Sequence, residues 1–348
     1  MGRTRAKGIR ASCIAACAVC ITSPIRAQQS GQDTFYAGRT VTLMAAAVGG
    51  TYDGYLRIFA QHMPKYIEGT PRMIVTNRPT GGGLEVVNVL GRIAPQDGST
   101  LAIVSQGMFL HQATGGSGLQ VSMGDLQWIG NFSQSNQVTI IWGKPEVRSI
   151  ADAKIHQVVL GASRAAGGSA DPPVLYNSLL GTKFKNVYGY RATDTRLAVE
   201  RGEVDGIGSI AWAAAKSVMS PLLKRPDTNV LVQLGLRRET DLPDVPLLDD
   251  LVRDDPDKLA IARFMGLTSV IARAIAAPPG IPAPRLTVLR NAFERVLIDP
   301  EFRASAAHAN LDITPMNGDE VTAAVAEILA TPKSTVESVK AAMTKVPR

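Results

Sequence analysis

The chain has few of the residues from which metal centres, disulfides and thiol catalysis are built. Its 348 residues include three cysteines and four histidines. All three cysteines, Cys13, Cys17 and Cys20, lie within the first 27 residues, so a mature chain that begins at Gln28 has none. No disulfide framework, zinc ribbon or cysteine nucleophile is then available. The histidines are scattered without the spacing of metal ligands, and we expect neither a metal site nor a cofactor.

Motifs of nucleotide and hydrolase chemistry are missing as well. No lysine follows the glycine-rich stretches as in a Walker A loop, and no G-x-G-x-x-G opens a predicted helix. Residues 161–165 (GASRA) come close to the G-x-S-x-G turn of serine hydrolases but end on alanine. His308 is the only histidine that follows this stretch, which leaves a secreted serine hydrolase using Ser163 or Ser209 as a minor alternative.

The first 27 residues have the pattern of a secretory signal peptide. Four basic residues from Arg3 to Arg10 precede an uncharged run at 11–22, and Ala27 precedes a polar start. The run is too short to span a bilayer. Lipidation at Cys17 is a weaker alternative, because little apolar sequence precedes it. Removal of the leader, with its five basic residues and no acidic one, lowers the formal net charge from +7 to about +2, and no nucleic-acid partner is indicated.

Beyond the leader, apolar runs of strand length alternate with segments of helical periodicity. This alternation predicts a mostly parallel sheet covered by helices, and therefore an α/β fold. Helices are expected at 53–63, 193–200, 285–297 and, near the C-terminus, around 299–308 and 318–331. Strands are expected at 41–46, 73–77, 101–104, 137–142, 158–160, 204–209 and 230–234, with a further extended segment at 266–271.

Two of the predicted strands lead into loops of small residues, each followed by a helix. The first loop is 49–53 and the second is 161–170. Glycines allow a ligand to approach the backbone closely, and the free N–H groups of a first helical turn favour an anion. Ligands of open α/β sheets lie beyond the carboxyl ends of the strands, so residues 105–108, after the strand at 101–104, are expected on the same edge as the first loop.

Arginines occur in two loops that follow strands. Arg164 and Arg191 could each grip a carboxylate with two parallel hydrogen bonds, although solvated surface arginines remain equally open. Asp53 and Asp205 could be paired catalytic carboxylates. For Asp53, however, a charge in the first turn of a helix is the stronger interpretation, and we expect it to position backbone and water.

A series of short motifs runs in order along nearly the whole mature chain. They are 49–53 (GGTYD), 77–83 (NRPTGGG), 94–101 (APQDGSTL), 190–191 (YR), 202–205 (GEVD), 242–246 (LPDVP) and 277–282 (APPGIP). None is specific alone, but the series resembles the receptors of tripartite tricarboxylate transporters, the Bug-type periplasmic solute-binding proteins.

The resemblance implies an α/β, two-lobed type II periplasmic binding protein fold with two interlobe crossovers and a ligand cleft. After the signal peptide at 1–27, lobe 1 would comprise 36–136 plus 265–348 and lobe 2 would comprise 137–264. The crossovers would lie near 136–138 and 264–266. The candidate ligand-binding residues are Gly49, Gly50, Thr51, Asp53, Ser105, Gln106, Ser163, Arg164, Ser169, Tyr190, Arg191 and Ser209.

The implied function is capture, not catalysis. The receptor would take a small carboxylate in the periplasm as a monomer and deliver it to the membrane permease subunits of a tripartite tricarboxylate transporter. A type II binding protein for an amino acid or aromatic acid of another transporter, a receptor domain used for sensing, and the serine hydrolase remain as alternatives.

Overall fold

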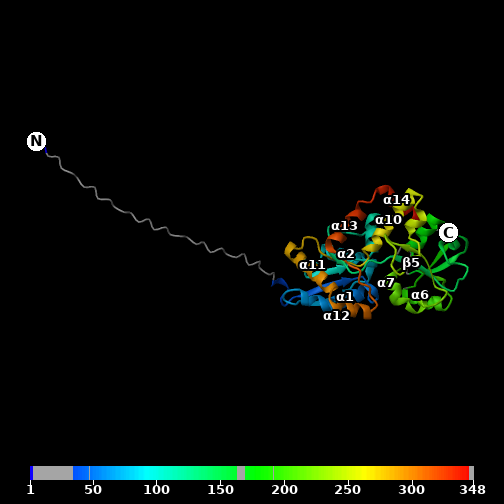
Figure 1. The fold of residues 1–348 in the computed structure, drawn as a ribbon, viewed down its shortest axis with the longest axis horizontal. Coiled ribbons are helices and arrows are strands. Elements are labelled where there is room, and N and C mark those ends of the chain that lie inside the picture. Colours follow the sequence, from blue (N-terminus) through cyan, green and yellow to red (C-terminus); the bar gives the residue numbers. More distant parts are fainter. Residues whose placement is uncertain (3–33, 47, 163–168, 191, 345–348) are drawn as a thin grey trace. The chain divides into compact units, whose positions relative to one another are not determined.

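The computed structural model describes residues 1–2, 34–46, 48–162, 169–190 and 192–344 (Figure 1). The chain divides into two units, Met1–Gln32 and Asp33–Arg348, and every element below belongs to the second. Apart from Met1 and Gly2, the predicted leader and the alternative lipidation site at Cys17 lie outside the described residues and stay predictions. No helix in the described part combines the length and the apolarity needed to cross a membrane.

The first of two β-sheets has six strands. In spatial order they are β11 (Met316–Asn317), β4 (Gln127–Asn131), β10 (Ala274–Ala277), β3 (Thr100–Ile103), β1 (Thr40–Ala45) and β2 (Arg72–Asn77). The strands β2, β1 and β3 are parallel, whereas β10 runs antiparallel to both of its neighbours and β11 runs antiparallel to β4. The carboxyl ends of β1 and β3 therefore lie at one edge, which we call the carboxyl edge of the first sheet.

The second sheet has five strands. In spatial order they are β7 (Phe184–Tyr188), β6 (Val158–Ala162), β8 (Gly206–Ala211), β5 (Gln137–Ile141) and β9 (Asn229–Leu234). Strand β6 is parallel to β7 and β8, and β5 is antiparallel to β8 and β9. Because these strands all lie between β4 and β10 in sequence, the chain passes from one sheet to the other twice.

Both sheets are mixed, so the prediction of a mostly parallel sheet is wrong. The antiparallel pairs involve β5 and β10, the strands at which the chain enters the other sheet, and the short β11. A parallel pair within one sheet is joined by a crossover, usually with a helix. Strands β5 and β10 are each entered from the other sheet, so no such crossover within their own sheet precedes them. An alternation of strands and helices along the chain does not report this change of sheet.

Helices cover both faces of the first sheet (Figure 1). One face carries α1 (Gly50–His62), α11 (Ala283–Leu297) and α12 (Pro300–His308), and the other carries α2 (Leu84–Arg92), α3 (Gly107–Ala113) and α13 (Gly318–Leu329). Successive side chains of β1 point to opposite faces of the sheet, so they pack into two different hydrophobic clusters. Leu43 belongs to the cluster that contains Tyr55 and Phe59 of α1, whereas Met44 belongs to the cluster that contains Leu90 of α2.

The remaining helices accompany the second sheet, apart from α10 and α14. They are α4 (Ile150–Ile155), α5 (Asp171–Leu180), α6 (Ala192–Glu200), α7 (Trp212–Val218), α8 (Ser220–Leu223) and α9 (Leu248–Val252). The seven strands expected between 41 and 234 are confirmed, and so are the helices expected at 53–63, 193–200, 285–297, 299–308 and 318–331, with small differences in their bounds.

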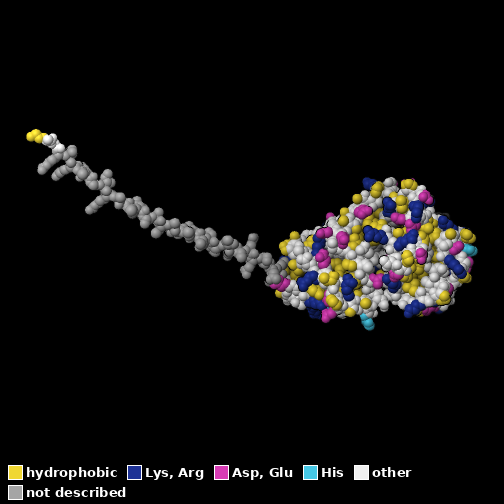
Figure 2. Space-filling view, viewed as in Figure 1, with side chains coloured by type: hydrophobic (Ala, Val, Ile, Leu, Met, Phe, Trp, Pro, Cys, Tyr) yellow, Lys and Arg dark blue, Asp and Glu magenta, His cyan; other side chains and the backbone are white. Residues whose placement is uncertain are grey.

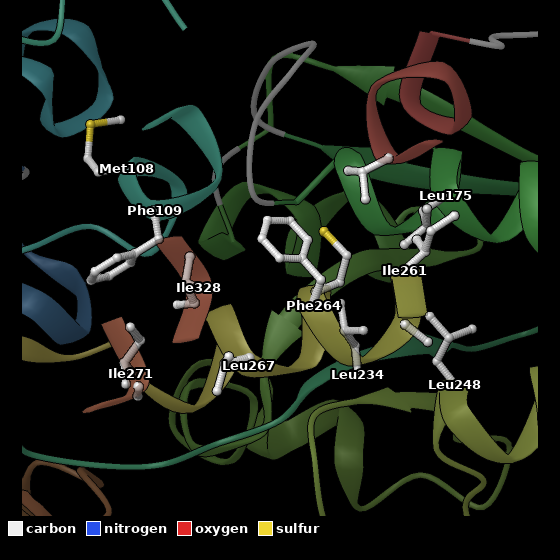
Figure 3. Close-up of a cluster of buried hydrophobic side chains, with 14 of the residues drawn as sticks. Met108, Phe109, Leu175, Leu234, Leu248, Ile261, Phe264, Leu267, Ile271 and Ile328 are labelled. Atoms are coloured by element: carbon white, nitrogen blue, oxygen red, sulfur yellow. The ribbon is translucent and has the colours of Figure 1, made fainter. Parts of the chain in front are cut away.

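The helix α10 (Pro256–Val270) replaces the extended segment expected at 266–271, so that prediction is wrong. Its residues from Phe264 to Ser269 are all buried, and an all-round apolar helix lacks the amphipathic period by which helices are recognised. The local start signals are present, because the Asp255 side chain accepts the Lys258 N–H at 3.1 Å and Pro256 begins the helix. Figure 3 shows Phe264 and Leu267 of α10 among side chains from elements of both sheets.

The C-terminal helix α14 (Lys333–Thr344) packs against α5 and α10. It belongs to the range predicted for lobe 1, while α5 belongs to the range predicted for lobe 2. The lobe boundaries stay a prediction. On the face drawn in Figure 2, basic and acidic side chains are interspersed and are not gathered by sign.

Candidate functional site

Asp53 holds the loop before α1 in place. It is 5% exposed. Its Oδ2 accepts the backbone N–H of Gly49 at 3.1 Å and Arg57 Nε at 2.8 Å, and its Oδ1 accepts Asn77 Nδ2 at 2.9 Å. Because Asn77 ends β2, one carboxylate fastens the loop after β1, the first turn of α1 and the end of β2 together.

These hydrogen bonds also set the charge of Asp53. Burial raises the pKa of its carboxyl, but the hydrogen bonds from Arg57, Asn77 and Gly49 outweigh burial and hold the pKa below its ordinary value. The carboxylate is therefore ionised at neutral pH, and its oxygens are occupied by the protein's own donors. This geometry suits the positioning role expected for Asp53.

The two glycines of this loop have left-handed backbone. Gly49 and Gly50 have φ values of +73° and +74°, and both are exposed. A Cβ added at either position would meet no atom within 4 Å, so the backbone conformation, not a lack of space, favours glycine. Thr51, which follows, is half-buried. The open backbone of this loop is accessible to a ligand, and its contact with one stays a prediction.

Ser105 lies beyond β3, against the glycine turn η3 (Thr80–Gly83). A Cβ on Gly83, where φ is +111°, would lie 2.9 Å from Ser105 Cβ, so this close approach requires glycine. The next residue, Gln106, donates its backbone N–H to Tyr52 Oη at 3.4 Å. The loop after β3 thus lies beside the start of α1, as expected for one edge.

A chain of side-chain hydrogen bonds joins the two sheets. Gln106, after β3 of the first sheet, accepts Gln137 Nε2 at 3.0 Å, and Gln137 Oε1 accepts Ser209 Oγ at 3.2 Å. Gln137 and Ser209 lie on β5 and β8 of the second sheet and are 8% and 5% exposed. Gln106 Nε2 also donates to Ser269 Oγ of α10 at 3.3 Å. Two predicted residues, Gln106 and Ser209, are therefore connected through Gln137.

The partner of Ser209 bears on the hydrolase alternative. A serine nucleophile needs a neighbouring base, and an amide side chain such as that of Gln137 cannot accept its proton. The hydrogen bond from Ser209 to Gln137 is therefore a structural contact. Ser163, Arg164 and Arg191 lie outside the described residues, and their roles stay predictions.

Ser169 lies at the end of the second loop, close to β8. A Cβ on Gly208 would lie 2.9 Å from the Ser169 carbonyl oxygen and 2.5 Å from Pro173 Cγ. Asn186 Nδ2 donates to the Ala170 carbonyl at 3.0 Å, which ties the same turn to β7. The backbone of Ser169 therefore lies against Gly208, the residue that precedes Ser209 in β8.

Tyr190 makes a different contact from the other predicted residues. Its hydroxyl donates to Glu203 Oε2 at 3.2 Å, and Arg201 Nε donates to Glu203 Oε1 at 2.6 Å. The structure therefore places the Tyr190 hydroxyl in a small charged group at the turn before β8. It does not bring this hydroxyl to the chain that contains Gln106 and Ser209.

An ion pair forms a second connection between elements of the two sheets. Lys216 Nζ of α7 lies 2.7 Å from Asp312 Oδ2, in the segment after α12, and 3.2 Å from Asp241 Oδ2. Burial lowers the pKa of Lys216, but hydrogen bonds and attraction to the two carboxylates outweigh it and raise the pKa above its ordinary value. Tyr55 Oη donates to the Asp312 carbonyl at 2.6 Å.

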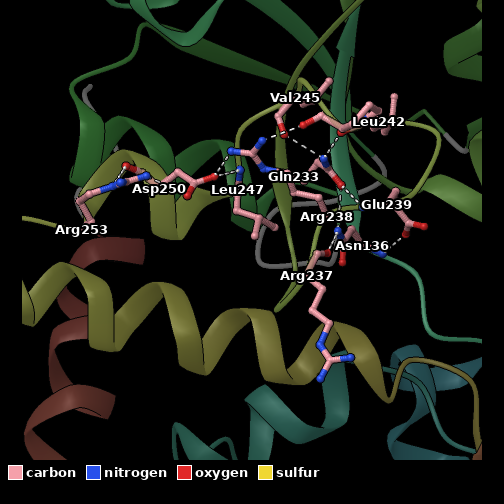
Figure 4. A network of polar contacts seen from close by, with 11 residues as sticks. Asn136, Gln233, Arg237, Arg238, Glu239, Leu242, Val245, Leu247, Asp250 and Arg253 are labelled. Carbon is pink, nitrogen blue, oxygen red and sulfur yellow. Dashed lines mark hydrogen bonds and ion pairs between the residues drawn. The ribbon is translucent and has the colours of Figure 1, made fainter.

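The segment that enters the second sheet is fastened by a polar network (Figure 4). Asn136 donates its N–H to Glu239 Oε1 at 2.7 Å and its Nδ2 to Gln233 Oε1 at 2.9 Å. Burial raises the pKa of Glu239. The fully buried Gln233 donates to the carbonyls of Leu242 and Val245, both at 2.9 Å. The motif at 242–246 therefore serves to anchor this crossover.

Two open cavities flank α10. Their volumes are about 510 and 520 Å³, and both are lined by Leu236 and Leu267. Neither is lined by a predicted ligand-binding residue.

A group of His62, Asp299 and Glu301 could geometrically hold a metal ion, but Lys65 Nζ already contacts both carboxylates, at 2.5 and 2.8 Å.

Sequence reasoning missed Gln137, Ser269 and Arg273. Gln137 is a polar residue at the start of a strand that is apolar apart from Thr139, so its buried amide needed a partner. Ser269 lies in the segment wrongly expected to be extended. Arg273 is the only charged residue between Arg263 and Arg285, and a lone charge in a long uncharged run was the signal available for it.

Known proteins share this fold. No model of a protein family matches the chain. A curated relative from Cupriavidus necator, named "UPF0065 protein in gbd 5′ region", is 21% identical over 316 residues, which are 89% of this chain and 90% of the relative. A TctC solute-binding protein from Polaromonas has a TM-score of 0.64 and 17% identity, with 89% of this chain and 100% of that chain covered.

A further similar structure is that of MatC from Rhodopseudomonas palustris, solved with bound malate. Its TM-score is 0.62 and its identity is 20%, with 86% of this chain and 98% of MatC covered. These likenesses confirm the implied fold, the two-lobed α/β architecture of periplasmic solute-binding proteins.

Proposed function

We propose that the chain, whose fold is that of TctC-type solute-binding proteins, is a periplasmic receptor for a small organic acid. The observation that carries the proposal is the hydrogen-bonded chain from Gln106 through Gln137 to Ser209, which joins polar side chains of the second sheet to a residue at the carboxyl edge of the first. Ligands of open α/β sheets bind beyond the carboxyl ends of the strands. MatC, a structure of the same fold, is described with bound malate, and this supports a carboxylate as the ligand class.

In this proposal the ligand is held by hydrogen bonds from both lobes. One part of the ligand is bound by backbone N–H groups of the loop at 49–53 and by polar side chains such as Ser105 and Ser209. The loop at 161–170 contributes from the second lobe, and Arg164 and Arg191 offer guanidinium groups for a second acidic group. Binding favours the closed arrangement because the ligand contacts both lobes only there. The closed receptor then delivers the acid to a tripartite tricarboxylate permease.

A thermal-shift screen of the purified protein tests the ligand class. The panel contains acetate, succinate, malate, adipate, citrate, aspartate and benzoate, with glycerol and glucose as uncharged compounds. A ligand at about 100 times its Kd adds roughly 2.7 kcal/mol to the unfolding free energy, which is a clear rise in Tm. We expect a carboxylate to raise Tm. A rise with glucose or glycerol and none with any acid would contradict the proposal.

A further inference from the structure

Arg273 is a buried cation without a partner. It is 3% exposed, and its Nε and Nη1 are enclosed without a hydrogen-bond acceptor. No ion pair joins its guanidinium to a carboxylate of the described residues. An arginine stays charged inside proteins, and an uncompensated buried charge is costly. Nη2 also donates no hydrogen bond to the described residues but, unlike Nε and Nη1, it is not enclosed. This end of the guanidinium therefore reaches solvent.

The backbone places Arg273 at the carboxyl edge of the first sheet. Strand β10 runs antiparallel to β3 with Ile275 opposite Ile103, so two further residues of this register bring Arg273 level with Ser105. The Arg273 N–H donates to Asn131 Oδ1 at 2.9 Å, and its carbonyl accepts the Phe132 N–H at 3.2 Å. Arg273 thus lies where β4 ends and the chain leaves for the second sheet.

The charged groups near Arg273 have other partners. Its charge acts on the phenol of Tyr55, and so do those of Asp312 and Lys216. The Asp312 carboxylate, however, is engaged by Lys216 Nζ at 2.7 Å, and it forms no ion pair with Arg273. Lys216 also contacts Asp241. Both carboxylates are therefore used by a lysine, and the guanidinium fork of Arg273 forms no ion pair with either.

We propose that Arg273 is the buried anchor for a carboxylate group of the ligand at the carboxyl edge of the first sheet. The inference rests on the proposed receptor function and names the side chain that neutralises the bound acid. A guanidinium presents parallel N–H donors that match the two oxygens of a carboxylate. In a buried site such a pair is strong because its surroundings screen it weakly.

Three variants test the anchor. Arg273→Met removes the charge and the paired donors but keeps an unbranched side chain, whereas Arg273→Lys keeps only the charge. Arg92→Met removes an exposed arginine and is the matched control. Tm without ligand and Kd for succinate, malate, adipate and citrate are measured for each. We expect Arg273→Met to lose affinity roughly thirtyfold or more, the lower end for truncation within a buried charge pair. Arg273→Lys should retain part of the affinity, and Arg92→Met all of it.

The Tm without ligand separates the anchor from a structural role. If Arg273 waits for a ligand, Arg273→Met is at least as stable as the wild type, because a buried uncompensated charge is removed. If Arg273 instead balances Asp312 and Asp241 through space, Arg273→Met loses Tm and Arg273→Lys recovers it, and the proposal is overturned. Unchanged affinity in Arg273→Met also overturns the anchor but leaves the receptor function standing. A wild-type protein that binds no acid of the thermal-shift panel overturns both.

Discussion

The backbone N–H of Gly49 donates a hydrogen bond to Asp53 Oδ2 over 3.1 Å, so a carboxylate in the first turn of α1 restrains the loop in front of its own helix. The same oxygen accepts Arg57 Nε, and the other oxygen accepts Asn77 Nδ2. All three donors come from the protein. The shape of the first loop is therefore set by the protein itself, which would lower the entropy cost of the proposed binding to its backbone.

Asp53→Asn should destabilise the protein. In asparagine an NH2 group replaces one of the two carboxylate oxygens. This donor then faces either the donors of Gly49 and Arg57 or that of Asn77, and it leaves them unpaired at a buried position. Such a loss costs about 1–3 kcal/mol of unfolding free energy. Urea denaturation measures the change, with Asp125→Asn, at an exposed carboxylate, as the matched control. Full stability in Asp53→Asn together with lost ligand binding would show that Asp53 contacts the ligand directly.

The contribution of Asp53 should depend on pH in one direction. Its folded-state pKa lies below the ordinary value of 3.8, so its stabilisation is fully present above that value and disappears as pH falls through the folded pKa. The difference in unfolding free energy between wild type and Asp53→Asn should thus be constant from about pH 7 to 5 and shrink below about pH 4. Urea titrations of both proteins at each pH measure it. If the difference in unfolding free energy grew as pH fell, the folded-state pKa of Asp53 would have to be raised and not lowered.

Local patterns predicted most elements, and tertiary contacts decided the others. Strand β1 and helix α1 each have a clear period, so sequence located them well. Helix α10 is apolar on all sides because elements of both sheets pack on it, and no amphipathic pattern distinguished it from a strand. The loop glycines and Asp53 carried local signals. Gln137 is important because it bonds to residues far away in sequence, and Arg273 because its guanidinium has no partner. Only the fold reveals either fact.

Gln137→Met should weaken the connection between the sheets. Methionine keeps the length of the side chain but offers no amide, so Gln106 Oε1 loses a donor and Ser209 Oγ loses its acceptor. We expect about 1–3 kcal/mol of lost stability and faster hydrogen exchange at 105–107. The exposed Gln120→Met is the matched control. Equal stability of the two variants would mean that water replaces Gln137 without cost, and that the chain is not structural.

The ion pair between Lys216 and Asp312 should contribute little to stability in spite of its 2.7 Å distance. The two side chains are 34% and 40% exposed, and pairs at this exposure are worth up to about 1 kcal/mol. A double-mutant cycle with Lys216→Met and Asp312→Asn measures their coupling, which should decrease as salt rises from about 0.01 to 1 M. A coupling that is large and insensitive to salt would instead indicate a dry contact between the sheets.

Gly208→Ala should disturb the second sheet more than a glycine substitution elsewhere. The new methyl group would lie 2.5 Å from Pro173 Cγ and 2.9 Å from the Ser169 carbonyl oxygen. A proline ring and a backbone carbonyl cannot rotate away, so the turn at Ser169 must move from β8, at a cost of about 1–3 kcal/mol.

Gly107→Ala is its matched control, because Gly107 begins α3 without a positive φ and its added Cβ would meet no atom within 4 Å. Alanine there should leave stability unchanged or raise it by up to about 1 kcal/mol. Chemical denaturation of both variants, and their affinity for whichever acid raises Tm in the thermal-shift screen, decide the matter. Because Ser209 adjoins Gly208, a shift of this turn in Gly208→Ala should also reduce ligand affinity. Equal stability and equal affinity of the two variants would mean that the turn at Ser169 does not rest on β8, and the second loop would then have to be supported from another element.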